Sequence, residues 1–412
     1  MKKIVALLLT LLMVIGMMSF ASADDKIVVT FQNGYTGPDG AVLTEIVDKF
    51  NAENDKNIFI QMEIMSGGVL WEKMPYAIST GTACDFSFLG DTSYIDYYNQ
   101  GLMRCVDDFW TYEGVNKEDF APAVLANVTT AKGETFGIPY DTVVYPLYWN
   151  KTLFEKAGLD PETPPQSYDE FIEYAIKLSD PDNGIFGVSL PVNDMTLFYH
   201  MLYANGGDVL NADKTVSTLN SEATLKTLQD IQKLVEAGAI PKGLTGGETD
   251  TVVLAGQVAM CVNGPWMVSG LNTNEINYGV STFPGQGAMS GTDFIFIPSS
   301  TPEEKIPAIY EFAKFFSSTE MKVKWALEAG YPPITLSAAA DEAIQNNYVI
   351  SQMGGCFDKV VPNWKLGITY AGLISDEAVT PMVEKVMNGE DPATAMAEAD
   401  ALITSIIAEY AE

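Results

Sequence analysis

The sequence predicts an α/β fold, in a chain of 412 residues that is long enough for two or more domains. Short runs of β-branched and apolar residues alternate with helical segments, and glycine-rich loops follow several of the runs. This alternation is typical of a sheet of parallel strands with helices on its faces. In addition, residues 258–262 (VAMCV) are apolar at every position, as expected for a strand that is buried on both faces.

The first part of the chain supplies three candidate ligand contacts. Open α/β sheets bind ligands in the loops at the carboxyl ends of their strands. Tyr35, Trp71 and Asp91 follow three successive predicted strands, so we predict that they share one edge of the sheet. Loop packing and helix capping are the alternative roles, and capping is the favoured one for Asp91. The predicted strands are 26–31, 58–65 and 84–89, and the predicted helices are 41–50 and the segment that carries Trp71.

The middle of the chain contains an extended apolar stretch, residues 136–151 (FGIPYDTVVYPLYWNK). After it, a helix is predicted to begin beyond Ser167, which can form a capping box with Glu170. Thr301 and Pro302 are predicted to start a long helix, with the threonine hydroxyl as its cap and proline at the first helical position. The other predicted elements are strands at 186–191, 278–282 and 291–298 and helices ending at 203 and spanning 220–238.

The stretch 253–271 (VLAGQVAMCVNGPWMVSGL) places an aromatic side chain at the end of a buried strand. Gly256 is predicted to close a helix, because glycine accepts a positive φ. The turn Asn263-Gly264-Pro265 ends the strand 258–262, since proline has no amide to donate. Trp266 follows at the carboxyl end of the strand, where a ligand is expected; a core tryptophan in a tight turn is the alternative.

The segment VAMCVNGPWMVSGLNTNEINYGVSTFPGQG resembles the family 1 extracellular solute-binding proteins of ABC sugar importers, the family of maltose-binding protein. Similar segments follow the family's order at NKTLFEKAGLDPETPPQSYDEFIEYAIKLS, NDMTLFYHMLYANGGDV and AGYPPITLSAAAD, and the likeness covers nearly the whole mature chain. It implies a two-lobed periplasmic-binding-protein fold, in which each lobe is a sheet flanked by helices and about three segments cross between the lobes. The implied lobes are 24–140 with 294–332, and 141–293 with 333–412.

The resemblance also implies further ligand contacts. Asp194 stands where the family has a sugar-contacting glutamate, whereas Thr196 replaces an aromatic residue, which puts the same sugar stacking in doubt. Trp364 is the alternative to Tyr370 as a cleft aromatic in VVPNWKLGITYAG. The residues implied to line the cleft are Asp141, Tyr145, Asp194, Tyr331 and Tyr370.

The N-terminus has the pattern of a secretory signal peptide, predicted over residues 1–23. Lys2 and Lys3 precede an apolar run, and Ala21-Ser22-Ala23 forms a cleavage site. We therefore expect an extracytoplasmic protein, in the periplasm or on the outer cell surface. No cysteine lies near the cleavage site, so a lipoprotein anchor is not predicted.

Charge and residue usage exclude several classes of function. The net charge of −31 argues against nucleic acid and anionic lipid as partners. His200 is the only histidine and lies in an apolar patch, and the four cysteines lack metal-binding spacing, so we expect no metal, no cofactor and no catalytic residue. A bridge between Cys84 and Cys105 stays open.

The residues and the resemblance together predict a monomeric carbohydrate-binding subunit that closes its lobes on a sugar and delivers it to the permease of an ABC importer. The candidate residues are aromatic and acidic, which suits the apolar faces and hydroxyl groups of a sugar. The alternatives are uptake of glycerol phosphate or another polar solute, sensing without transport, and, least favoured, an enzyme that acts on carbohydrate.

Overall fold

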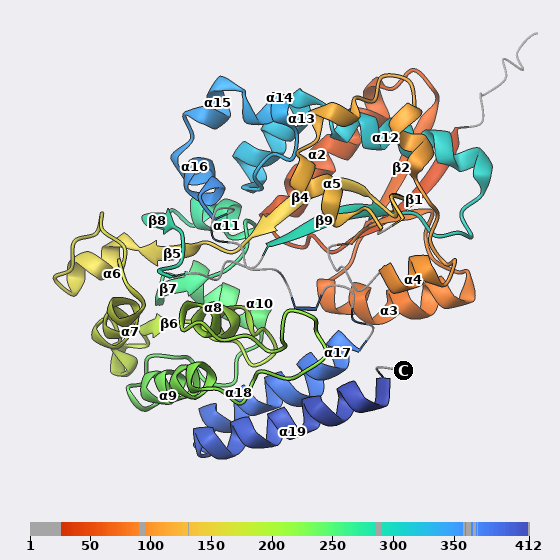
Figure 1. Cartoon of the computed structure of the whole chain (residues 1–412). Coiled ribbons are helices and arrows are strands. Elements are labelled where there is room, and N and C mark those ends of the chain that lie inside the picture. Colours follow the sequence, from red (N-terminus) through yellow and green to blue (C-terminus); the bar gives the residue numbers. More distant parts are fainter. Residues whose placement is uncertain are drawn as a thin grey trace, which may run out of the picture.

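The structure is a computed structural model that describes residues 26–410, apart from 90–94, 131, 286–289, 357–358, 360–363, 366–367 and 369. Two sheets form within the described residues, and helices flank both of them (Figure 1). We call the part built on the first sheet lobe 1 and the part built on the second sheet lobe 2. The mixed α/β architecture confirms the predicted fold class.

Lobe 1 is built on a five-stranded sheet in the order β2-β1-β3-β9-β4. Strand β1 runs parallel to β2 and β3, as predicted from the alternation of strands and helices. Strand β9 is antiparallel to β3 and to β4, so the sheet is mixed, because β9 enters it on the return from lobe 2. The strands are β1 (Ile27–Asn33), β2 (Ile58–Ile64), β3 (Phe86–Leu89), β4 (Ile138–Val144) and β9 (Ser290–Phe296).

Aromatic side chains fill the core of lobe 1 between the sheet and its helices. Phe31 of β1 stacks on Phe86 of β3 with ring centroids 4.5 Å apart, and Phe312 of α12 packs against both rings. All three side chains are fully buried, which makes this layer a large part of the hydrophobic stabilisation. The helices of this lobe are α2 (Pro38–Glu53), α3 (Gly67–Thr80), α4 (Ile95–Asn99), α5 (Pro122–Asn127), α12 (Ile306–Phe316), α13 (Thr319–Lys324) and α14 (Leu336–Ala339), with a π-helical turn η6 (Trp325–Ala329) after α13.

Lobe 2 is built on a four-stranded sheet in the order β6-β7-β5-β8. The central strand β7 is buried at all five positions, which confirms the prediction from its continuous apolar run. It runs parallel to β6 and antiparallel to β5. The strands are β5 (Leu147–Asn150), β6 (Phe186–Val188), β7 (Val258–Val262) and β8 (Tyr278–Ser281).

The helices of lobe 2 follow the predicted caps in most places. Ser167 caps α7 by accepting the Glu170 amide hydrogen, whereas the Glu170 carboxylate accepts from the Gln166 amide, so only the serine half of the predicted capping box forms. The helices are α6 (Lys151–Lys156), α7 (Tyr168–Lys177), α8 (Thr196–Ala204), α9 (Glu222–Glu236), α10 (Gly246–Leu254), α11 (Met267–Thr273), α15 (Glu342–Gln345), α16 (Tyr348–Gly354), α17 (Ala371–Ile374), α18 (Thr380–Met387) and α19 (Pro392–Tyr410).

One prediction about local structure is wrong, and one point that the sequence left open is resolved. Thr301 does not cap a helix: its hydroxyl donates to the Asp85 carbonyl, a 3₁₀ turn follows at Glu303–Lys305, and α12 begins at Ile306. The bridge that the sequence left open between Cys84 and Cys105 is not formed, and both thiols are free. The Thr301 hydroxyl is taken up by a tertiary contact with a carbonyl 216 residues earlier in the chain, which local spacing does not display.

The chain passes between the two sheets at Tyr145-Pro146, which joins β4 to β5, and again between β8 and β9. A third passage follows α14, since α16 packs against β8 of lobe 2. Strand pairing extends the first sheet to Val144 and back to Ser290. The lobe boundaries predicted at 140/141 and 293/294 therefore fall inside β4 and β9. We propose instead that the lobes divide in the connections between these strands and their neighbours, between residues 144 and 147 and between residues 281 and 290.

The lobes meet closely where helix α11 of lobe 2 packs on α2 and η6 of lobe 1. Gly330 ends η6 with a φ of +93°, a conformation that glycine adopts without strain. A side-chain carbon at Gly330 would lie 2.7 Å from the Pro265 carbonyl oxygen and 2.6 Å from the Cβ of Val268. The absence of a side chain at this position is therefore what lets the two lobes approach.

We predict that Gly330→Ala destabilises the protein more than Gly389→Ala. Gly389 has a φ of +95° and nothing within 4 Å of an added methyl group, so its substitution should cost only the backbone strain, about 1–2 kcal/mol. Gly330→Ala adds the clash between the lobes, a further 1–3 kcal/mol or so. Chemical denaturation of both variants measures the difference, and equal losses would contradict the close contact.

Candidate functional site

A small hollow of about 50 Å³ lies at the carboxyl ends of β6 and β7, against the first turns of α8 and α10. Asp194 and Trp266, both predicted to contact ligand, line this hollow. It also contains Thr249, Asp250 and Asn263, which were not predicted. Parallel strands deliver their following loops to one edge of the sheet, and that edge is where these side chains meet.

The polar groups of the hollow are partly paired with one another. Asn263 Nδ2 donates to Asp250 Oδ1 at 2.6 Å, and Asp194 Oδ1 accepts from the Thr196 amide at 2.9 Å. Burial raises the pKa of Asp250 to about 6; the Asn263 hydrogen bond opposes this shift and the nearby charge of Asp194 adds to it. The Thr249 hydroxyl is buried without a hydrogen-bond partner among the described residues. The hollow therefore has free acceptor and donor capacity for a bound molecule.

Trp266 stands at the start of α11, between the cores of the two lobes. Its six-membered ring lies against Gly264, where a side-chain carbon would come within 2.1 Å of it, so the turn needs glycine for the indole to adopt this position. The Tyr145 ring meets the indole edge-on, with centroids 6.0 Å apart. The NGPW sequence thus fixes the orientation of a half-buried aromatic at the junction of the lobes.

A second group of predicted residues forms a polar cluster in lobe 1. The Tyr35 hydroxyl lies 2.9 Å from the Tyr140 hydroxyl and donates to Asp141 Oδ2 at 3.3 Å. Trp325 Nε1 donates to the same carboxylate oxygen at 3.2 Å. The Tyr331 ring stacks on Trp325. We call Tyr35, Asp39, Tyr140, Asp141, Asp293, Lys322, Trp325 and Tyr331 the tyrosine–aspartate cluster.

Burial controls the charges of this cluster. It raises the pKa of Asp141 to about 6, against hydrogen bonds and the charge of Lys322 that favour the ionised form. It also lowers the pKa of Lys322 to about 7, and the charge of Asp141 opposes that shift. Lys322 Nζ donates to the Tyr140 carbonyl and lies 3.7 Å from the centroid of the Phe316 ring. Lys322 is therefore occupied beneath the surface and does not face the hollow.

The structure brings most of the predicted contacts to the junction of the lobes. Tyr35, Tyr145 and Trp266 are partly buried and pack against the same lobe 1 core. Asp141 and Tyr331 are each only 1% exposed, so they support the site from below its surface. Their roles as ligand contacts, like those of the other predicted residues, stay predictions.

Three other predicted contacts lie apart or outside the described residues. Tyr370 is half-buried at the start of α17, where its ring lies 6.0 Å from that of Tyr410, and it packs against the lobe 2 core that Tyr145 also contacts. Trp364, its alternative, is 2% exposed. Trp71 belongs to α3, but its side chain lies outside the described set, as does the whole of Asp91.

The missed residues carried weak sequence signals. Asn263 is part of the NGPW segment, where the sequence indicates only a turn. Asp250 lies inside α10 and resembles any exposed helical carboxylate until the fold places it beside Asp194. His200 behaves as predicted: it is buried, its Nδ1 lies 2.8 Å from the Thr196 carbonyl, and burial lowers its pKa to about 4, so it stays neutral at physiological pH.

Comparison with known proteins identifies the family. Residues 45–349 match the family described as bacterial extracellular solute-binding protein. The chain belongs to this family. A putative binding protein of Brucella abortus is 26% identical over 354 residues, which cover 80% of this solute-binding protein and 83% of the relative.

Two solved structures share its fold. One is an ABC transporter solute-binding protein from Thermotoga lettingae, bound with alpha-D-tagatose, with a TM-score of 0.83 at 22% sequence identity. The superposition covers 93% of this chain and 100% of the Thermotoga lettingae chain. The other is UgpB from Mycobacterium tuberculosis, in complex with glycerophosphocholine, with a TM-score of 0.82 at 18% sequence identity. That superposition covers 92% of this chain and 98% of the UgpB chain. These likenesses confirm the predicted fold, and the family match confirms the resemblance seen in the sequence.

The family is one of extracellular binding proteins, which agrees with the predicted location outside the cytoplasm. Within the described residues, no helix combines the length and the apolar character needed to cross a membrane. The same residues include no group of three or more histidine, cysteine or acidic side chains that could hold a metal ion.

We predict that Asp250→Asn removes part of the pH dependence of stability. The folded pKa of about 6 lies above the unfolded value of about 3.9, so the folded state holds the extra proton and the wild type loses stability as the pH rises through this range. At pH 7 the Asp250→Asn variant should be more stable than the wild type by about 1–2 kcal/mol, because it no longer buries an ionised carboxylate; this range allows for solvent screening.

Urea denaturation between pH 4 and pH 7 measures this difference. Asp213→Asn, at an exposed position of lobe 2, is the matched control and should keep the slope of the wild type. An unchanged slope in Asp250→Asn would mean that this carboxylate titrates normally.

Proposed function

We propose that this solute-binding protein binds a sugar or oligosaccharide between its two lobes and delivers it to the permease of an ABC importer. The observation that carries the proposal is the hollow in which Trp266 stands beside Asp194 and Asp250 at the junction of the lobes. An indole covers the apolar face of a sugar ring, and carboxylates accept hydrogen bonds from its hydroxyl groups. The family and the sugar-bound relative from Thermotoga lettingae support this assignment.

A neutral ligand is favoured over a sugar phosphate. Phosphate groups are usually bound by arginine, lysine or a nest of backbone amides. The described residues that line the hollow include no lysine or arginine, and Asp194 and Asp250 would repel an anion. Uptake of glycerol phosphate or another polar solute is the second candidate, because a structural relative binds glycerophosphocholine.

The proposed site combines both lobes. Trp266 and Asp194 would contact the sugar from lobe 2, and Tyr35 and Tyr145 from the junction, with Asp141 and Tyr331 beneath them. Trp71, Asp91 and Tyr370 remain proposed contacts at the cleft. The passages between the sheets would act as the hinge on which the lobes close.

We propose that the protein acts without catalysis, as a monomer outside the cytoplasm, after removal of a signal peptide over residues 1–23. It would bind no nucleic acid and no cofactor. Glycoside hydrolysis needs two carboxyl groups that flank the bond at about 5–5.5 or 6.5–9.5 Å. The Asp141–Asp293 pair, which is opposed in β4 and β9, is buried in the lobe 1 cluster and cannot flank a substrate.

A thermal-shift screen of the mature protein against neutral sugars, polyols and sugar phosphates tests the proposal. A ligand at a hundred times its dissociation constant stabilises the protein by about 2.7 kcal/mol, which gives a readable shift in Tm. We expect hits among neutral sugars. A response to sugar phosphates alone would overturn the neutral-ligand assignment, and turnover of a hit, seen by chromatography, would overturn the absence of catalysis.

We predict that Trp266→Ala weakens binding of the best sugar by about 10–100-fold, since it removes the stacking surface at the junction of the lobes. Isothermal titration calorimetry on the folded variant measures the loss. Tyr348→Ala is the control, because Tyr348 is an aromatic of lobe 2 that is 54% exposed and lies outside the hollow. Equal affinities for the wild type and Trp266→Ala would remove the indole from the site.

A further inference from the structure

The hollow at the carboxyl ends of β6 and β7 is too small to hold a whole sugar. Its volume is about 50 Å³, and Trp266 forms part of its lining. Small-molecule sites in proteins usually have about 300–1,000 Å³, and one water molecule occupies about 30 Å³ in the liquid. The hollow therefore has room for only a few non-hydrogen atoms. A sugar ring that stacks on Trp266 stays outside it, and only an exocyclic group enters.

The wall of the hollow is apolar in one part and polar in another. Leu197 and Val262 are buried aliphatic side chains in this wall. Thr249, Asp250 and Asp194 supply its polar groups. A hydroxymethyl group has the matching character, because its methylene carbon is apolar and its hydroxyl both donates and accepts a hydrogen bond.

The Thr249 hydroxyl lacks a partner in this wall. Thr249 is 2% exposed, and its Oγ1 atom has no hydrogen-bond partner among the described residues. Threonine hydroxyls in helices can donate to the carbonyl four residues earlier, as Thr251 of the same helix α10 does to Gly247 at 3.0 Å. Thr249 makes no such bond, and a buried hydroxyl without a partner is unfavourable. A ligand hydroxyl in the hollow would supply the missing partner.

Asp250 is held in the same wall as a hydrogen-bond acceptor. It follows Thr249 in α10, and its Oδ1 atom accepts from Asn263 Nδ2 at 2.6 Å. The Asn263 side-chain oxygen accepts from the Gly264 amide at 2.8 Å, so both ends of the Asn263 amide are engaged and hold the carboxylate in place. Among the described residues, Oδ2 of Asp250 accepts no hydrogen bond. This oxygen is therefore open to a donor on a ligand.

We propose that the hollow receives the hydroxymethyl group of a sugar whose ring stacks on Trp266, and that Thr249 and Asp250 select for this group. The inference rests on the proposed sugar-binding function and names the class of sugar, one that carries a free hydroxymethyl group. Its methylene packs on the aliphatic wall, and its hydroxyl accepts from Thr249 and donates to Asp250.

The same geometry disfavours three related kinds of sugar. A 6-deoxy sugar would fill the hollow with a methyl group and leave the hydroxyl of Thr249 and the carboxylate of Asp250 unpaired. A pentopyranose would leave the hollow unfilled. A uronate would place its carboxylate against Asp194 and Asp250, which would repel it.

Calorimetric titration of the mature protein with matched sugars tests this specificity. The first series is glucose, 6-deoxyglucose, xylose and glucuronate, and the second is galactose, 6-deoxygalactose, arabinose and galacturonate. Cellotriose and xylotriose form the matched pair for a site that takes an oligosaccharide. We expect the sugar with the hydroxymethyl group to bind at least tenfold more tightly than its 6-deoxy and pentose counterparts, and the uronate to bind weakest.

Thr249→Val should remove this preference, because valine has nearly the shape of threonine and no hydroxyl. We expect the variant to weaken binding of the hexose about tenfold and to leave binding of the 6-deoxy sugar unchanged. Thr251→Val is the matched control, since Thr251 is an exposed residue of the same helix that lies outside the hollow. It should keep the preference of the wild type.

Equal binding of a hexose and its 6-deoxy or pentose counterpart by the wild type would overturn the inference, whether or not the variants fold. A preference that survives in folded Thr249→Val would also overturn it. Either result leaves the proposed function intact, because sugars still bind and Trp266→Ala still weakens them. Binding of none of these sugars would instead contradict the proposed function, and this inference with it.

Discussion

The arrangement of this solute-binding protein depends on the close packing of helix α11 against Gly330. Because Gly330 has no side chain, the Pro265 carbonyl oxygen and the Val268 side chain can pack against its backbone. A Cβ atom at residue 330 would lie only 2.7 Å and 2.6 Å from them. Pro265 belongs to the turn that presents Trp266, and Tyr331 follows Gly330 directly. One backbone contact therefore aligns an aromatic of lobe 2 with the tyrosine–aspartate cluster of lobe 1.

Burial of charge is the second constraint on the site. Lobe 1 places Asp39, Asp141 and Asp293 with the single cation Lys322 beneath the junction, and lobe 2 places Asp250 beside Asp194. Burying ionised groups is unfavourable unless they are paired or hydrogen-bonded. Tyrosine hydroxyls, Trp325 and Asn263 provide those hydrogen bonds. The result is an acid-rich junction, whose carboxylates would accept hydrogen bonds from the proposed neutral ligand and would repel an anion.

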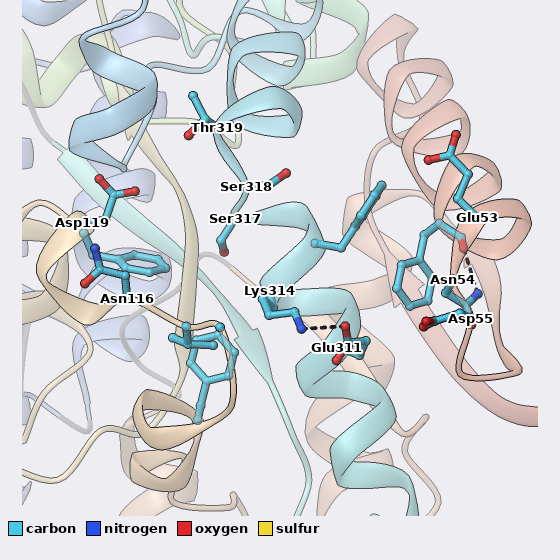
Figure 2. Close-up of a pocket in the computed structure, with 16 residues that line it drawn as sticks. Glu53, Asn54, Asp55, Asn116, Asp119, Glu311, Lys314, Ser317, Ser318 and Thr319 are labelled. Carbon is cyan, nitrogen blue, oxygen red and sulfur yellow. Dashed lines mark hydrogen bonds and ion pairs between the residues drawn. The ribbon is translucent and has the colours of Figure 1, made fainter.

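The two cavities of the structure differ in how the fold builds them. The hollow at the junction is narrow and takes its side chains from the edge of one sheet, where parallel strands gather their loops. On lobe 1, a wider groove of about 640 Å³ lies between the end of α2, the segment 114–120 and the junction of α12 and α13, so segments far apart in the chain form it (Figure 2).

The sequence by itself determined the α/β class, the buried strand β7, the packed His200 and the aromatic of the NGPW turn, because periodicity, glycine and proline act locally. Tertiary structure decided which carboxylates share a cavity: Asp250 meets Asp194 only when α10 and α8 reach the same sheet edge. It also turned β9 antiparallel, moved the start of α12 to Ile306 and buried Tyr331. Such outcomes depend on contacts between residues far apart in the chain, which local spacing does not encode.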